Sequence, residues 1–205
     1  MEKLNGNNPN HPKEGSHITV DPIRDEKDIK SIKRKLKKES LRDYLLFTMG
    51  INNGLRISDL LKIKVGMVKH LNVGETLDII EQKTKKKNVL MVNGAIHEAL
   101  HLYLRSIVLN DTDYLFQSRN YDENGDRKPL NRETVSKMIK KWTAGLNGNY
   151  STHSLRKTWG YIQRKRFGVP FEIICKRFNH TSPVVTMRYL GIEDKEVIGI
   201  LLNEI

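Results

Sequence analysis

Apolar residues recur at spacings of three and four through most of this chain. That spacing places them on one face of a helix, which can then pack against a core. The pattern predicts helices over 30–38, 40–53 and 154–167, and further helices that begin after Ser58, Asn93 and Asn131, at Pro170 and Pro183, and from Asp194. Gly54 and Gly168 follow two of these helices, as expected of a residue that ends helices in the left-handed conformation.

Strand patterns are fewer and shorter. Residues 77–81 and 89–92 have the aliphatic composition of two strands, joined by a lysine-rich turn at 83–87. Tyr114–Phe116 is strand-like, and residues 117–129 are expected to form a polar loop with an Asn-Gly turn signal. The sequence therefore predicts an α+β fold that is mainly α, with a small antiparallel β-hairpin.

These elements are expected to form one domain over residues 18–193. Residues 1–17 are rich in Asn, Pro, Gly and His and are expected to be a disordered tail. Residues 194–205 are predicted to form a last short helix. Its apolar side chains either fold back onto the domain or are exchanged with a neighbouring subunit, and they include Ile198, Leu201, Leu202 and Ile205.

The charge balance indicates a nucleic-acid partner. The chain has 36 Lys and Arg against 24 Asp and Glu, a formal net charge of +12, and such an excess concentrates polyanions at the surface. The single cysteine, Cys175, lies in an apolar run and is predicted to be a buried structural thiol. The chain has neither an apolar stretch of about 20 residues nor an apolar signal core, so we expect a cytoplasmic, nucleoid-associated protein without a membrane partner.

Residues suited to phosphate chemistry lie near the carboxyl end. His153 and Arg156 are three apart at a helix start, so both project from one face of a turn that favours anions. His180 precedes another helix start, and Tyr189 follows about two turns later. A phenol can attack phosphorus while such groups hold the phosphate oxygens. Each residue also has a plainer structural explanation: a salt-bridged arginine, a surface histidine or a core tyrosine.

A second arginine and a lysine complete this set. Arg56 stands in a Gly-Leu-Arg turn before a helix, and Asp59 is expected to brace its guanidinium while its outer nitrogens stay free for phosphate. Lys83 begins the lysine-rich turn, from which an ammonium can protonate a leaving alkoxide. A solvated turn, with phosphate contacts by Lys85 and Lys86, is the simpler alternative.

In this order, the motifs resemble the catalytic domain of the tyrosine recombinases, the phage integrase family. Residues 54–60, Gly-Leu-Arg-Ile-Ser-Asp-Leu, are similar to its first arginine motif, with Asp59 where Glu is commoner. Residues 152–156, Thr-His-Ser-Leu-Arg, are similar to the second. Residues 178–189 resemble the terminal box, with Asn179 in place of a usual Gly. The resemblance extends over roughly residues 20–195.

The resemblance implies DNA strand exchange through a covalent 3′-phosphotyrosine intermediate. The catalytic residues would be Arg56, Lys83, His153, Arg156, His180 and Tyr189. The tyrosine would attack, the arginines would clamp the phosphate oxygens, and the lysine would protonate the leaving 5′ oxygen. The histidines would donate further hydrogen bonds, and His153 could also receive the phenol proton. No metal or other cofactor is expected, because two guanidiniums neutralise the phosphate.

The expected partner is double-stranded DNA, bound by a homo-tetramer. Only about 40 residues precede the first catalytic helix, too few for the core-binding domain usual in the family, so the chain is expected to grip one face of the duplex. Weakly specific, salt-sensitive phosphate contacts would come from Lys33, Arg34, Lys37, Lys85 and Lys86. Recombination would then require an accessory protein or cooperative assembly.

Three other functions remain open from the sequence. A type IB topoisomerase would use similar groups to nick and reseal one strand. A DNA-binding accessory protein could retain the fold without catalysis, although all six catalytic positions are filled. A basic helical domain that binds RNA or protein would make the motif matches a coincidence.

Overall fold

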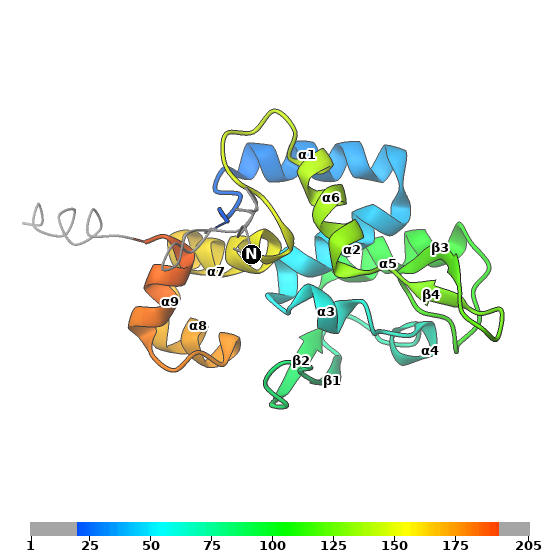
Figure 1. The fold of residues 1–205 in the computed structure, drawn as a ribbon. Coiled ribbons are helices and arrows are strands. Elements are labelled where there is room, and N and C mark those ends of the chain that lie inside the picture. The colour runs from blue at the N-terminus through cyan, green and yellow to red at the C-terminus, as the bar shows by residue number, and fades with distance from the viewer. Residues whose placement is uncertain (1–19, 193–205) are drawn as a thin grey trace, which may run out of the picture.

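The computed structural model describes residues 20–192, so the expected tail at 1–17 and the helix at 194–205 lie outside the described residues. This part contains, in chain order, α1 (Glu26–Glu39), α2 (Leu41–Asn53), α3 (Ile57–Leu60), α4 (Val65–Val68), β1 (Thr76–Ile80), β2 (Lys87–Met91), α5 (Gly94–Arg105), β3 (Gln117–Tyr121), β4 (Arg127–Pro129), α6 (Arg132–Trp142), α7 (Thr152–Phe167), α8 (Phe171–Phe178) and α9 (Pro183–Leu190) (Figure 1). The predicted class, mainly α with small antiparallel β elements, is confirmed.

The main core forms around α2, which packs against α1, α5 and α7. Its side chains Leu45, Leu46 and Phe47 are fully buried. Gly54 ends α2 in the left-handed conformation at φ 62°, where a Cβ atom would lie 2.6 Å from the Trp159 ring. Glycine is therefore required here by both backbone and space, and the chain turns directly into the Arg56 segment.

The α8–α9 pair has a small apolar cluster of its own. Ile174, Phe178, Leu190 and Ile192 are buried together and are separate from the main core. Figure 1 shows the pair at one end of the molecule, reached through α7, with the β3–β4 hairpin at the opposite end. The pair that carries Tyr189 is thus joined to the rest of the protein by a limited set of contacts.

The expectation of a polar loop over residues 117–129 is wrong, because this segment forms the antiparallel β3–β4 hairpin. The Asp122 carboxylate accepts the N–H groups of Asn124 and Asp126, at 2.9 Å each, and closes the tip. The strands are largely exposed and polar on both faces, so they lack the alternation that marks a half-buried strand. Tyr114 makes only an isolated bridge to Lys64, where a strand was expected.

Three helix starts also differ from the sequence prediction. α1 begins at Glu26, four residues before the expected start at 30. Arg56, not Ser58, is the N-cap residue of α3, which places the arginine at the helix entrance. α7 begins at Thr152, two residues earlier than expected, after a Ser151 cap. The shifts in α3 and α7 place Arg56 at the entrance of one helix and His153 in the first turn of the other.

Two further predictions are confirmed. Cys175 is buried, and its thiol donates to the carbonyl of His180 at 3.4 Å. The side chains of Asn93, Asn131 and Ser182 cap α5, α6 and α9 as expected. Across residues 20–192, no helix has the length and apolar character needed to cross a bilayer.

Candidate active site

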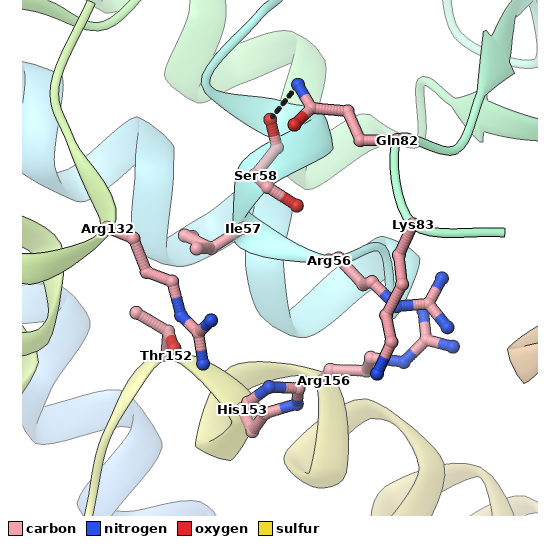
Figure 2. Close-up of a pocket in the computed structure, with 9 residues that line it drawn as sticks. All are labelled: Arg56, Ile57, Ser58, Gln82, Lys83, Arg132, Thr152, His153 and Arg156. Carbon is pink, nitrogen blue, oxygen red and sulfur yellow. Dashed lines mark hydrogen bonds between the residues drawn. The ribbon is translucent and has the colours of Figure 1, made fainter. Parts of the chain in front are cut away.

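A pocket of about 390 Å³ opens where the first turns of α3, α6 and α7 meet the turn after β1. Its lining residues are Arg56, Ile57, Ser58, Gln82, Lys83, Arg132, Thr152, His153 and Arg156 (Figure 2). Four of these nine are arginine or lysine and none is acidic. Such a lining attracts an anion and has room for a phosphate group.

Arg56 is held at the pocket wall by a buried carboxylate. Its guanidinium forms an ion pair of 2.6 Å with Glu81, whose side chain is fully buried. Glu81 also accepts hydrogen bonds from Thr84 at 2.5 Å and Asn88 at 2.9 Å. Burial by itself would raise the pKa of Glu81, but these donors and Arg56 together lower it. The carboxylate therefore stays ionised and fixes the arginine.

This arrangement corrects the expectation for Asp59. Arg56 pairs with Glu81 rather than with Asp59, whose carboxylate accepts the backbone N–H of Gln82 at 3.0 Å. Burial raises the pKa of Asp59. Its hydrogen bond ties α3 to the residue before Lys83. The sequence analysis did not identify Glu81 as a site residue. Glu81 follows an apolar strand, and it reaches Arg56 only when β1 folds back.

Arg156 lies deeper than Arg56 and is 2% exposed. It donates to the carbonyls of Gly54 and Phe178, both at 2.7 Å, and its guanidinium lies 4.4 Å from the centroid of the Phe178 ring. Burial lowers the pKa of Arg156 to about 10, which keeps it charged at neutral pH. Arg156 thereby joins the end of α2 to α8 at the pocket.

Lys83 is exposed at the start of the turn between β1 and β2 and lines the pocket. Figure 2 shows its side chain extending toward the same space as Arg156 and His153. The turn is closed by the backbone N–H of Lys85, which donates to the backbone carbonyl of Glu81 at 2.9 Å. Lys85 adopts a left-handed φ of 57°. The tight turn presents the ammonium of Lys83 at the edge of the pocket.

Tyr189 and His153 are brought together from α9 and α7. His153 Nδ1 lies 3.2 Å from the Tyr189 hydroxyl. Burial, with the charges of Arg132 and Arg156, lowers the pKa of His153 to about 4, so the neutral imidazole can accept the phenol hydrogen. Burial raises the pKa of Tyr189 to about 12, although Arg156 opposes this shift. The phenol is therefore protonated at neutral pH, with an acceptor in contact.

His180 packs beside the same tyrosine, with 5.0 Å between the ring centroids. Its Nδ1 lies 3.0 Å from the Thr186 hydroxyl, which fixes the orientation of the ring. Burial and the charges of Arg156 and Arg56 lower the pKa of His180 to about 4. The structure thus gathers all six predicted residues around the pocket and the adjoining tyrosine.

Arg132 is a pocket residue that the sequence analysis missed. It occupies the first turn of α6, directly after the Asn131 cap, and is the strongest cationic influence on the pKa of His153. An arginine at a helix N-terminus is disfavoured by the helix dipole. That conflict is the signal that could have identified it, because a bound anion would resolve it.

The predicted DNA contacts on α1 differ from those on the hairpin. Lys37 pairs with Glu98 at 2.7 Å, and the Lys33 ammonium lies 5.8 Å from the centroid of the Tyr44 ring. Arg34 is exposed on α1, and the hairpin residues Lys85 and Lys86 are exposed as well. A role for these five cations in DNA binding stays a prediction.

Comparison with known proteins decides the family, because residues 24–196 match the model of the phage integrase family. The chain belongs to the phage integrase family. It is 36% identical over 182 residues to the probable integrase/recombinase YoeC of Bacillus subtilis. The matched residues cover 87% of this chain and 92% of YoeC. It is 27% identical over 162 residues to the tyrosine recombinase XerC of Caldanaerobacter subterraneus, with 76% of this chain and 43% of XerC covered. The chain therefore spans nearly all of one family member but less than half of the other.

Solved structures confirm the fold of a tyrosine recombinase catalytic domain. A crystal structure of XerA recombinase gives a TM-score of 0.69 at 21% identity, over 93% of this chain and 68% of that one. XerH site-specific recombinase bound to a palindromic difH substrate, in a post-cleavage complex, gives a TM-score of 0.66 at 18% identity. That match covers 92% of this chain and 55% of the XerH chain. With the family match, these likenesses place the chain among the tyrosine recombinases and exclude a coincidental set of motifs.

The departure at Asn179 from the family's usual glycine is now explained. Asn179 ends α8 in the left-handed conformation, at φ 54°, a region that glycine enters freely and asparagine more readily than most other residues. Its backbone N–H donates to the carbonyl of Lys176 at 3.1 Å. The backbone N–H of His180 donates to the carbonyl of Cys175, also at 3.1 Å. Asparagine therefore preserves the turn that presents the family's second histidine.

Removal of the Arg132 charge should raise the pKa of His153. In Arg132→Gln, the strongest neighbouring positive charge is lost. NMR titration should therefore give a pKa of His153 above the value of about 4 that it has beside Arg132. Arg166→Gln is the matched control, because Arg166 pairs with Glu26 at 3.2 Å and does not line the pocket. An unchanged His153 titration in Arg132→Gln would show that the charge of Arg132 does not lower this pKa, and that burial and the other cations set it.

Proposed function

We propose that this protein is a site-specific DNA recombinase in which Tyr189 forms a covalent 3′-phosphotyrosine intermediate. One observation carries the proposal: the Tyr189 hydroxyl contacts the neutral imidazole of His153 beside a pocket lined by four cations and no acid. A nucleophile, a proton acceptor and a phosphate-sized cationic pocket are the components that transesterification of a phosphodiester requires.

The first step transfers a proton and makes one bond. With a pKa of about 12, the phenol needs a base at neutral pH, and His153 accepts its proton through Nδ1. The Tyr189 oxygen then bonds to phosphorus, and the bond from phosphorus to the 5′ oxygen breaks. The leaving oxygen takes a proton from Lys83. Rejoining reverses each transfer, so phosphodiester bond energy is conserved.

The pocket cations stabilise the charge that builds on the phosphate oxygens. Arg56 and Arg156 are fixed by protein contacts before DNA arrives, so little reorganisation opposes the reaction. Arg132 adds a third guanidinium at the opposite helix entrance. The negative charge of a phosphate entering this site offsets the positive charges that lower the pKa values of the two histidines. Their pKa values should then rise, which favours hydrogen donation by His180.

Cleavage should not depend on a divalent metal. The guanidiniums take the place of a metal as the electrostatic partner of the phosphate, and residues 20–192 contain no cluster of three or more His, Cys, Asp or Glu suited to hold one. A nicked duplex traps the covalent product, because the short leaving strand diffuses away. We expect equal adduct with excess EDTA and with Mg²⁺. Adduct formation only with Mg²⁺ would contradict the mechanism.

We further propose that the protein acts as a tetramer on DNA, held in part by residues 194–205. The apolar residues Ile198, Leu201, Leu202 and Ile205 give this segment a face to bury. Deletion of residues 195–205 should impair assembly on paired sites by at least about tenfold, a loss of about 1.4 kcal/mol, with little change in single-site affinity. Analytical ultracentrifugation with DNA measures both. Normal tetramer assembly by the truncated protein would overturn the proposal.

Two finer features of the proposal follow from the activity. Recombination acts on cellular DNA, so we place the protein at the nucleoid in the cytoplasm. If the chain alone cuts nicked substrates but fails to join two sites, an accessory protein is required. A two-site recombination assay, with and without extract from the producing cells, separates that case from a nicking-resealing activity.

A further inference from the structure

We propose that Arg177 is a positioning residue that locks the hairpin bearing Lys83 onto the α8–α9 pair bearing Tyr189. The inference rests on the proposed function, because it assigns Arg177 an effect on the protonation of the leaving 5′ oxygen. Arg177 itself does not line the pocket, so it acts through other residues and has no contact with substrate.

Arg177 joins its own helix, α8, to two other segments. From α8, its Nε and one terminal nitrogen donate to the carbonyl of Asn53 at 3.0 and 2.7 Å. The same terminal nitrogen donates to the carbonyl of Val89 at 2.8 Å, and the other donates to Asn88 Oδ1 at 2.5 Å. All three guanidinium nitrogens are therefore engaged with protein groups at the end of α2 and on β2.

The partner Asn88 passes this connection to the turn that carries the lysine. Its amide nitrogen donates to Glu81 at 2.9 Å and to the carbonyl of Arg177 at 3.4 Å. Asn88 faces Ile79 across the β1–β2 ladder, and Glu81 closes the turn through Thr84. Arg177, Asn88 and Glu81 thus form one hydrogen-bonded chain from α8 to the residues on either side of Lys83.

The lock matters because apolar packing does not hold these two parts together. The buried cluster of the α8–α9 pair is separate from the main core, and the substantial helix contacts of the pair are with α7. The β1–β2 hairpin is largely exposed. Polar contacts of Arg177 therefore set the distance between the Tyr189 nucleophile and the hairpin lysine. That distance matters because attack at phosphorus and protonation of the leaving oxygen require both groups in line with the phosphate.

The test compares two leaving groups on otherwise identical nicked duplexes. In one, the bridging 5′ oxygen is replaced by sulfur, which leaves as a thiolate and needs no protonation because thiols are far stronger acids than alcohols. Arg177→Met should cut ordinary DNA more slowly, on the order of 100-fold, and should cut the sulfur substrate near the wild-type rate. DNA affinity and its salt dependence should be unchanged.

Three further variants guard against simple misfolding. Asn88→Ala removes the other end of the lock with a smaller change, and it should show the same selective defect. The double variant should be no slower than the slower single variant, as expected of residues that act through one contact. Lys176→Met is the charge-matched control, because Lys176 is exposed on the same helix, and it should cut both substrates normally.

Lys83→Ala separates failure of the inference from failure of the proposed function. If the sulfur substrate does not rescue Lys83→Ala, the general-acid role of Lys83 is wrong. If it rescues Lys83→Ala but neither Arg177→Met nor Asn88→Ala, only the lock is wrong. Loss of DNA affinity in Arg177→Met, with a normal cleavage rate at saturating DNA, would make Arg177 a phosphate contact and would also overturn the lock.

Discussion

Tyr189→Phe should abolish the covalent protein–DNA adduct while DNA affinity is unchanged. The substitution removes one oxygen, the atom proposed to bond to phosphorus, and leaves a ring of the same shape. That ring packs against Phe178 and His180, with centroids 5.6 and 5.0 Å away, so the α8–α9 pair should keep its structure. The measurement is an SDS-resistant band on a nicked cognate duplex, with binding followed by fluorescence anisotropy.

Tyr161→Phe is the matched control for that experiment. Tyr161 lies on α7 and packs against the small apolar cluster, with the Arg24 guanidinium 5.7 Å from its ring centroid. The Tyr161→Phe variant should form adduct normally. Tyr150 is a poor alternative nucleophile, because it is buried and its hydroxyl donates to the carbonyl of Asn147 at 2.9 Å. An adduct that persists in Tyr189→Phe would place the nucleophile elsewhere, with Tyr150 and Tyr161 the next residues to test.

Glu81→Ala should destabilise the protein and slow cleavage together. It leaves Arg56 without its anion, and loss of one partner of a buried ion pair costs on the order of 3 kcal/mol. Cleavage should fall on the order of 100-fold, because a mobile guanidinium no longer meets the phosphate oxygens in a fixed place. Urea unfolding and single-turnover cleavage measure the two effects.

The pH dependence of stability identifies the ionised form of Glu81. Its pKa is lowered in the folded protein, so its contribution is present above the unfolded value and is lost as pH falls through the folded value. The difference in unfolding free energy between wild type and Glu81→Ala should therefore shrink on acidification. Glu98→Ala is the control, because the exposed Lys37–Glu98 ion pair is screened by solvent and should contribute little to the free energy of unfolding. Equal effects of both substitutions would contradict a special role for Glu81.

Most of the helices and the six catalytic candidates could be predicted from the sequence because their signals are local. The cap residues Asn93, Asn131 and Ser182 accept hydrogen bonds from N–H groups three residues ahead, so they mark helix starts within one turn of chain. The recombinase motifs are also short, and their order along the chain was sufficient to indicate the family that the comparisons then showed.

Contacts between distant segments were beyond the reach of the sequence. Asp59 was the obvious partner for Arg56 because it is three residues away, yet Glu81, 25 positions along, holds the guanidinium. The β3–β4 hairpin escaped notice because exposed polar strands carry no alternation. Arg132 enters the pocket only because α6 points its first turn at α7.

The sequence by itself determined which residues are candidates for the chemistry and where most helices begin and end, since both depend on side-chain type and near neighbours. Only the tertiary structure decided how these residues are held. A buried carboxylate or guanidinium requires partners wherever the fold can supply them. For Arg56 that partner is Glu81, and for Arg177 the partners are Asn53, Asn88 and Val89. Those contacts exist only after the hairpin and the α8–α9 pair have packed beside α2.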